Sequence, residues 1–177
     1  MRKILFGLLC FTAAPASAEV VSASANGFEI RHSISLVVPQ ERAYAAIGQI
    51  QSWWSKDHTY SGDSSRLSLQ LRPGGCFCER LDGGGGIEHL RVAYVQPGER
   101  VVLTGGLGPL LFEATAGVMD LSVERIAGGS RISMNYRAAG FANGGAEKMA
   151  PLVDKVLGEQ MKRLRTFAAG GAKPAPK

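Results

Sequence analysis

The chain has few of the residues that mark specialised protein classes. Of its 177 residues, 45% are hydrophobic, 20% are charged and only three are cysteine, and the mean hydropathy is close to zero. This balance excludes a disordered, low-complexity chain and a collagen-like repeat. Three cysteines are too few for a disulfide scaffold, and no apolar run reaches the roughly 18 residues that a membrane-spanning helix needs. We therefore expect one globular domain without a membrane span.

Signals of nucleotide and nucleic-acid binding are also missing. The basic residues are spread over separate predicted strands, with no stripe that interleaves them with aromatic side chains. Glycine-rich stretches at residues 83–86 and 105–108 neither open a helix after a strand nor precede a Lys-Ser or Lys-Thr pair, which excludes a P-loop. No nucleophile-elbow serine and no carboxylate pair at helical spacing is present. The sequence thus predicts no nucleic-acid partner and no cofactor.

The first 18 residues have the three parts of a secretory signal peptide. Arg2 and Lys3 form a positive region, residues 4–11 form a short apolar region, and Ala16-Ser17-Ala18 is an A-x-A cleavage site. We expect cleavage between Ala18 and Glu19 and a periplasmic or secreted protein. Removing 18 of 177 residues leaves 159, and losing two basic residues lowers the formal net charge from +5 to +3. A buried N-terminal helix is the alternative interpretation.

Alternating hydrophobicity predicts strands in most of the remaining chain. Residues 28–38 place apolar side chains at every second position, as in a strand with one buried face. Pro39 then opens a short helix, and the pair Trp53-Trp54 falls in a second one. Between residues 66 and 138, including a segment at 112–124, short alternating stretches are separated by turns rich in glycine and proline. Such short connections favour an antiparallel meander of about six strands.

The period of the pattern changes near the C-terminus. Apolar side chains recur at intervals of three and four from Met149 to Phe167, which predicts an amphipathic helix of roughly 20 residues, ~30 Å long. Pro151 is expected to mark its first turn or a bend. Residues 170–177 are predicted to be a disordered tail, so the domain spans residues 19–169. A helix ~10 Å across cannot cover six or seven strands ~4.8 Å apart, and with only 7% aromatic residues an open pocket is favoured.

Several local motifs accompany this order of elements. They are Val37-Val38-Pro39, Trp53-Trp54, Arg72-Pro73-Gly74-Gly75 with Phe77 and Glu79, residues 92–97 leading to Leu103-Thr104, the turn at 105–110, Tyr136 with Gly140, and residues 153–164. In these motifs the chain resembles the START-like or SRPBCC superfamily, in the branch of chaperone-ATPase activator homologues and polyketide-cyclase-like proteins. The resemblance implies an α+β helix-grip fold, in which a curved antiparallel sheet of six to seven strands wraps around a long C-terminal helix over an apolar cavity.

The resemblance implies three alternative functions. The first is binding of a small hydrophobic ligand in the cavity, by a monomer or weak dimer; the second is a cyclase, dehydratase or hydrolase that uses acid–base residues of the cavity. The third is a protein-interaction module, against which export argues because the chaperone partner and its ATP are cytosolic. The candidate catalytic residues are Glu79, His89 and Tyr136. The candidate ligand-binding residues are Trp53, Trp54, Phe77, Glu79, His89, Phe112, Met134, Tyr136, Val153 and Val156.

Glu79 and His89 are the candidates with titratable side chains on predicted strands. Glu79 shares a strand face with Phe77, and a carboxylate that faces an aromatic cavity would have a raised pKa. Pairing with an arginine such as Arg91 is the alternative. For His89 the alternation leaves open which face of its strand is buried, because His89 and Leu90 fall on opposite faces.

Two cysteines, Cys76 and Cys78, lie beyond the leader. In an unbulged strand residues i and i+2 have Cα atoms ~6.5 Å apart and parallel Cβ vectors, which opposes a disulfide between them. A soft-metal site completed by a histidine or methionine is one alternative, and intermolecular or redox chemistry of the thiols is another. The three histidines, His32, His58 and His89, show no ligand spacing. We therefore expect two free thiols and no bound metal.

Overall fold

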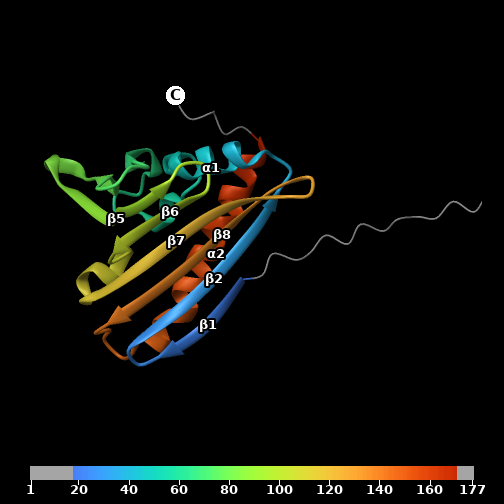
Figure 1. Ribbon diagram of the computed structural model, residues 1–177. Coiled ribbons are helices and arrows are strands. Elements are labelled where there is room, and N and C mark those ends of the chain that lie inside the picture. The colour runs from blue at the N-terminus through green and yellow to red at the C-terminus, as the bar shows by residue number, and fades with distance from the viewer. Residues whose placement is uncertain (1–17, 171–177) are drawn as a thin grey trace, which may run out of the picture.

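Eight antiparallel strands form one curved sheet, and a single long helix lies against one face of it (Figure 1). The computed structural model describes residues 18–170. The strands are β1 (Ala18–Ser24), β2 (Gly27–Leu36), β3 (Leu67–Leu69), β4 (Cys76–Arg80), β5 (Gly86–Gln96), β6 (Arg100–Gly105), β7 (Thr115–Ile126) and β8 (Gly129–Gly140). The helices are α1 (Gln40–Gly48) and α2 (Ala146–Gly170), with short 3-10 turns η1 (Ile50–Ser52), η2 (Lys56–His58), η3 (Ser64–Arg66), η4 (Asp82–Gly84) and η5 (Gly108–Phe112).

The sheet order is β1-β2-β8-β7-β6-β5-β4-β3. Strands β3 to β8 follow one another as neighbours, which confirms the predicted antiparallel meander, and β8 then pairs with β2. Burial alternates along β8, where Ile132, Met134 and Tyr136 face the core. The alternation predicted for residues 28–38 is confirmed in β2, whose side chains at 28, 30, 34 and 36 are buried. The α+β class expected from the sequence is therefore correct.

The expected strand count of six to seven is wrong, because the sheet has eight strands. The missing one is β1, which pairs only with β2 through a tight turn at Ala25-Asn26. As an edge strand with two adjacent valines among alanine, serine and glutamate, it carries little alternation. The Asn26-Gly27 dipeptide was the available hairpin signal. A smaller difference is at Phe112, which ends η5 and precedes β7 instead of starting the strand.

Helix α2 begins at Ala146, before the predicted start, so Pro151 lies inside it. It packs against β1, β2 and α1. Close approach to β2 depends on Gly158, where a β-carbon would stand 3.0 Å from Cε1 of the buried His32. Nε2 of His32 lies 2.9 Å from Oδ1 of Asp154, so this histidine also faces the helix. Because α2 covers the β1–β2 side, the β5–β6 side must be covered by other segments.

No helix within residues 18–170 is both long and apolar enough to cross a membrane. The predicted leader and tail lie outside the described residues except for Ala18 and Gly170. Their cleavage and disorder therefore stay predictions.

The expectation that Cys76 and Cys78 are not bonded to each other is wrong. The two residues form a disulfide, and their Cα atoms are 5.4 Å apart. The expectation assumed a separation of ~6.5 Å, that of a regular extended strand. The observed separation is shorter and lies within the range of protein disulfides, and the neighbouring strand β5 has a register shift opposite Phe77 and Cys78.

Candidate ligand-binding cavity

A cavity of about 370 Å³ lies between the N-terminal half of α2 and the segments that cover the β5–β6 side of the sheet. One wall is the apolar face of α2. The others come from the loop after η1, from the β6–β7 connection and from β5. The lining consists of Trp54 and residues 57–60, residues 107–110, His89, and Met149, Leu152, Val153, Val156 and Leu157.

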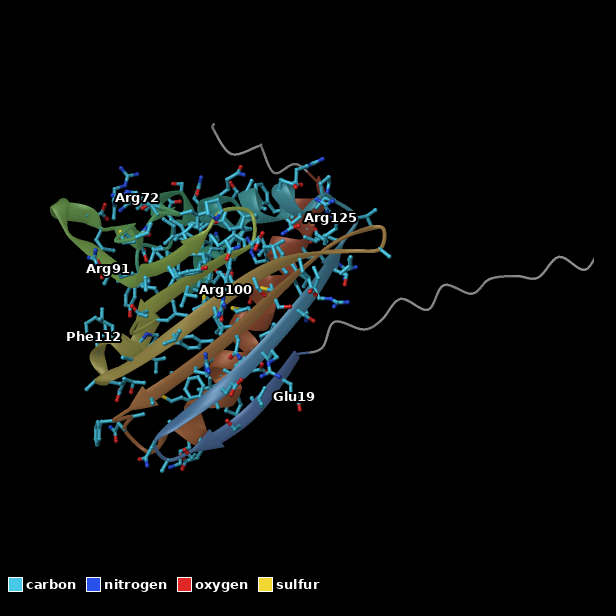
Figure 2. All side chains as sticks on the ribbon, viewed as in Figure 1. Glu19, Arg72, Arg91, Arg100, Phe112 and Arg125 are labelled. Atoms are coloured by element: carbon cyan, nitrogen blue, oxygen red, sulfur yellow. A yellow bond between two sulfur atoms is a disulfide. The ribbon has the colours of Figure 1, made fainter. Side chains whose placement is uncertain are left out.

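The cavity has a buried apolar floor and an exposed rim. Trp54, Leu110 and Leu157 are buried, whereas Tyr60 is 44% and Leu152 67% exposed. The phenol ring of Tyr60 lies 6.2 Å from the ring of Phe112. Figure 2 shows Phe112 pointing away from the sheet at this end of the molecule. A ligand could therefore enter from solvent between Tyr60 and α2.

His89 reaches the core because of the bulge in β5. In the register between β4 and β5, Phe77 lies opposite Leu90 and Cys78 opposite Glu88, so His89 is the extra residue. His89 and Leu90 are consequently both buried, although strict alternation would place them on opposite faces. This local break in the period is why the alternation could not decide which face of β5 is buried.

Glu79 of β4 is the partner of His89. Its Oε2 lies 3.0 Å from Nε2 of His89, and both side chains are at least 95% buried. The same carboxylate accepts hydrogen bonds from the backbone N–H groups of Tyr60, at 3.1 Å, and Ser61, at 2.5 Å. Glu79 therefore fixes both His89 and the loop that forms the cavity rim. The alternative partner, Arg91, instead pairs with Glu88 on the exposed face.

The protonation of this pair follows from its surroundings. Burial acts to raise the pKa of Glu79, but the hydrogen bonds from Ser61, Tyr60 and His89 outweigh it and hold the pKa below its usual value. The predicted upward shift of this pKa is wrong for that reason. Burial lowers the pKa of His89, against the opposing effect of Glu79. At neutral pH an ionised carboxylate thus faces a neutral imidazole.

Four of the predicted ligand-binding residues, Trp54, His89, Val153 and Val156, line the cavity. The other six do not. Phe77 and Glu79 contact His89 but are not part of the lining, and the Phe77 ring lies 4.7 Å from the imidazole. Phe112 is 71% exposed. The remaining three belong to the core: Trp53 donates its indole N–H to Ala46 O, and Met134 and Tyr136 are buried on β8.

Tyr136 lacks the position expected of a catalyst. Its ring is fully buried against Gly117, and burial raises the pKa of its hydroxyl. The lining residues 57–60 and 107–110 were not among the predicted site residues. The glycine and proline of 107–110 indicate a turn, and nothing in the local sequence shows that this turn faces α2.

Each histidine has a carboxylate neighbour. His58, on the cavity wall, lies 3.3 Å from Glu159 of α2, and both are partly exposed. Within residues 18–170, no three His, Cys, Asp or Glu side chains converge as a set of metal ligands. The candidate site is therefore best described as an apolar cavity with one buried histidine–carboxylate pair.

No family model and no curated protein matches the sequence. Solved structures do match. The Aha1 dimer from Colwellia psychrerythraea is 16% identical with a TM-score of 0.57, covering 82% of this chain and 98% of that one. CalU16 from Micromonospora echinospora is 13% identical with a TM-score of 0.57, covering 90% and 88%. An uncharacterised protein from Rhizobium leguminosarum is 18% identical with a TM-score of 0.52, covering 86% and 99%. At these identities the chain shares the fold of these structures.

Proposed function

We propose that this protein is an exported member of the START-like, SRPBCC superfamily that binds a small, largely apolar molecule between α2 and the sheet. The observation that carries the proposal is the cavity, whose floor is apolar and whose one buried polar lining side chain, among the described residues, is His89. Its volume of about 370 Å³ falls within the range of roughly 300–1,000 Å³ typical of small-molecule sites.

Membership of the superfamily is supported by the architecture. An eight-stranded antiparallel sheet, short helices after β2 and a long C-terminal helix agree with the helix-grip arrangement. Export is supported by the tripartite leader in the sequence. The Cys76–Cys78 disulfide is the kind of bond that persists in an oxidising compartment.

An acid–base enzyme is the second candidate function, and the Glu79–His89 pair is the observation that favours it. A carboxylate that orients a neutral imidazole beside a cavity is an arrangement that can move a proton. We rank the enzyme second because acid–base catalysis needs a second catalytic group in the cavity. Tyr136, the remaining candidate, lies outside the cavity lining.

A protein-interaction module on the outer face of the sheet has less support. Among the described residues, Val21 and Tyr94 are the strongly exposed large hydrophobic residues that belong to strands. Charged pairs cover this face instead, such as Arg100 of β6 with Asp120 of β7, whose Nε and Oδ1 are 2.9 Å apart (Figure 2). A docking surface of the usual kind would present a contiguous apolar patch there.

The substitution Val156→Trp tests the proposal. Val156 is half-buried on the α2 wall, so an indole there fills the cavity. We expect saturable fluorescence binding of prodan, an apolar probe without a hydrogen-bond donor, by the wild type and at least tenfold weaker binding by Val156→Trp at an unchanged melting temperature. Val37→Trp, at a residue 91% exposed and away from the cavity, is the matched control.

The two possible states of this region give opposite results. If this region were a solid core, an added indole would overpack it, lower the free energy of unfolding by ~1–3 kcal/mol and lower the melting temperature. A wild type that binds no prodan, together with a destabilised Val156→Trp variant, would show that the cavity is filled and that the binding proposal is wrong.

A further inference from the structure

One buried polar atom of a cavity-lining residue has no hydrogen-bond partner. Nδ1 of His89 is buried and makes no hydrogen bond to any described residue. The rest of the imidazole ring is in contact with protein groups. Nε2 faces Glu79, and the rings of Tyr60 and Phe77 pack against the imidazole at centroid distances of 5.9 and 4.7 Å. Buried polar atoms in native proteins are nearly always paired, so an unpaired one in a cavity-lining residue points to a ligand or water as its partner.

The chemical character of this atom follows from its partner on the other side of the ring. An ionised carboxylate can only accept hydrogen bonds, and Glu79 already accepts them from two backbone N–H groups. Nε2 of a neutral His89 must therefore carry the proton and donate it to Glu79. Nδ1 is then a bare lone pair, which accepts a hydrogen bond and cannot donate one.

We infer that the ligand carries a hydrogen-bond donor, a hydroxyl or an N–H, which binds Nδ1 of His89 while the rest of the molecule packs against the apolar floor. This inference rests on the proposed function and narrows it to one ligand class. A ligand that lacks the donor would leave Nδ1 unpaired in the site, so we expect it to bind, but about tenfold more weakly than a ligand of the same shape that carries the donor.

The charges around the site exclude an anionic head group in this position. Glu79 holds a buried negative charge 3.0 Å from the imidazole. Asp57 belongs to the same wall, and Glu159 pairs with His58 at the rim. A ligand carboxylate or phosphate would find an acceptor and not a donor at Nδ1, and it would lie on the same ring that Glu79 contacts from its other side. A neutral donor such as a phenol or alcohol satisfies the lone pair without adding charge.

Two probes of nearly equal shape test the inference. 2-Naphthol and 2-methylnaphthalene differ by a hydroxyl in place of a methyl group. Their dissociation constants are measured for the wild type and for His89→Phe. Because the hydration of each probe is the same in both titrations, the change in the ratio of the two constants reports the contact with His89 alone. We expect the preference for 2-naphthol to fall by about tenfold in His89→Phe, the effect of one buried hydrogen bond.

His58→Phe is the matched control, since it makes the same replacement at the other histidine of the cavity wall. Whatever it does to the two affinities, their ratio is expected to match the wild type. An unchanged ratio in His89→Phe, with both probes still bound, would overturn the inference and leave the proposed function standing. Failure of both probes to bind the wild type would overturn both.

A measurement on the wild type keeps the test independent of how His89→Phe folds. Long-range ¹H–¹⁵N NMR of the imidazole ring distinguishes the two nitrogens. We expect His89 in the Nε2–H form, with the Nδ1 resonance shifting when 2-naphthol is added and staying in place with 2-methylnaphthalene. A ring protonated at Nδ1, or the same response to both probes, would contradict the inference.

Discussion

Replacing Glu79 by glutamine removes one buried negative charge and almost no volume. The carboxylate accepts three hydrogen bonds, from the backbone N–H groups of Tyr60 and Ser61 and from Nε2 of His89. A carboxamide offers one oxygen and one NH₂ group in the same place. At least one of the three donors then faces another donor.

The cost follows from this count. A buried donor without an acceptor costs ~1–3 kcal/mol, and the remaining hydrogen bonds lose the added strength of an ionised acceptor. We expect Glu79→Gln to lower the free energy of unfolding by about 2–3 kcal/mol, which for a domain of this size lowers the melting temperature by roughly 4–12 °C. Prodan binding is expected to weaken as well, because the loop that carries Tyr60 loses its anchor.

The effect has a defined pH dependence. The pKa of Glu79 is lowered in the folded protein from an ordinary value of 4.5. Its stabilising contribution is therefore present above pH 4.5 and is lost as the pH falls through the folded-state pKa. The difference in stability between the wild type and Glu79→Gln should be largest near neutral pH and shrink below pH 4.5.

Thermal and urea unfolding followed by circular dichroism measure this difference. Glu124→Gln is the control, since Glu124 is a surface carboxylate, 59% exposed, that pairs with Arg131. Exposed pairs of this kind contribute ~0–1 kcal/mol. A Glu79→Gln variant as stable as Glu124→Gln at pH 7 would show that the buried carboxylate does not anchor the loop.

Three further outcomes are expected. Thiol counting under denaturing, non-reducing conditions should find no free thiol from Cys76 and Cys78, and two thiols per monomer would contradict the disulfide. Gly117→Ala places a β-carbon 2.6 Å from the buried ring of Tyr136 and should destabilise the protein by ~1–3 kcal/mol in urea unfolding, whereas an unchanged midpoint would mean that the ring is free to move. Intact-mass measurement of protein from the periplasm should show a chain that starts at Glu19, and a retained leader would refute export.

The regular elements could be predicted from the sequence because their periods are long and clean. The β2 strand has one uninterrupted buried face, and the apolar positions of α2 repeat over several turns. The meander followed from the short turns between strands. The strand that the sequence did not predict is β1. It has no such alternation, and only its pairing with β2 defines it as a strand.

The site was harder to predict for the same reason. Val153 and Val156 could be placed on the cavity because they lie on α2, whose apolar face the pattern defines, whereas Trp54 lies in the loop after η1. The register shift in β5 brings His89 and Leu90 to one side, and it accompanies the Cys76–Cys78 disulfide in β4. A period-two pattern cannot show a single inserted residue, so the Glu79–His89 contact emerges only from the paired strands.

Mapping a bound ligand onto the chain tests the central claim most directly. In a ¹H–¹⁵N correlation titration of the wild type with 2-naphthol, saturable shifts are expected at residues 54–60, 107–110 and 149–157 and at His89, the segments that surround the cavity. The same titration of Val156→Trp should leave these resonances in place. Shifts that do not saturate, or that gather on the outer face of the sheet around Arg100, would contradict a binding cavity between α2 and the sheet.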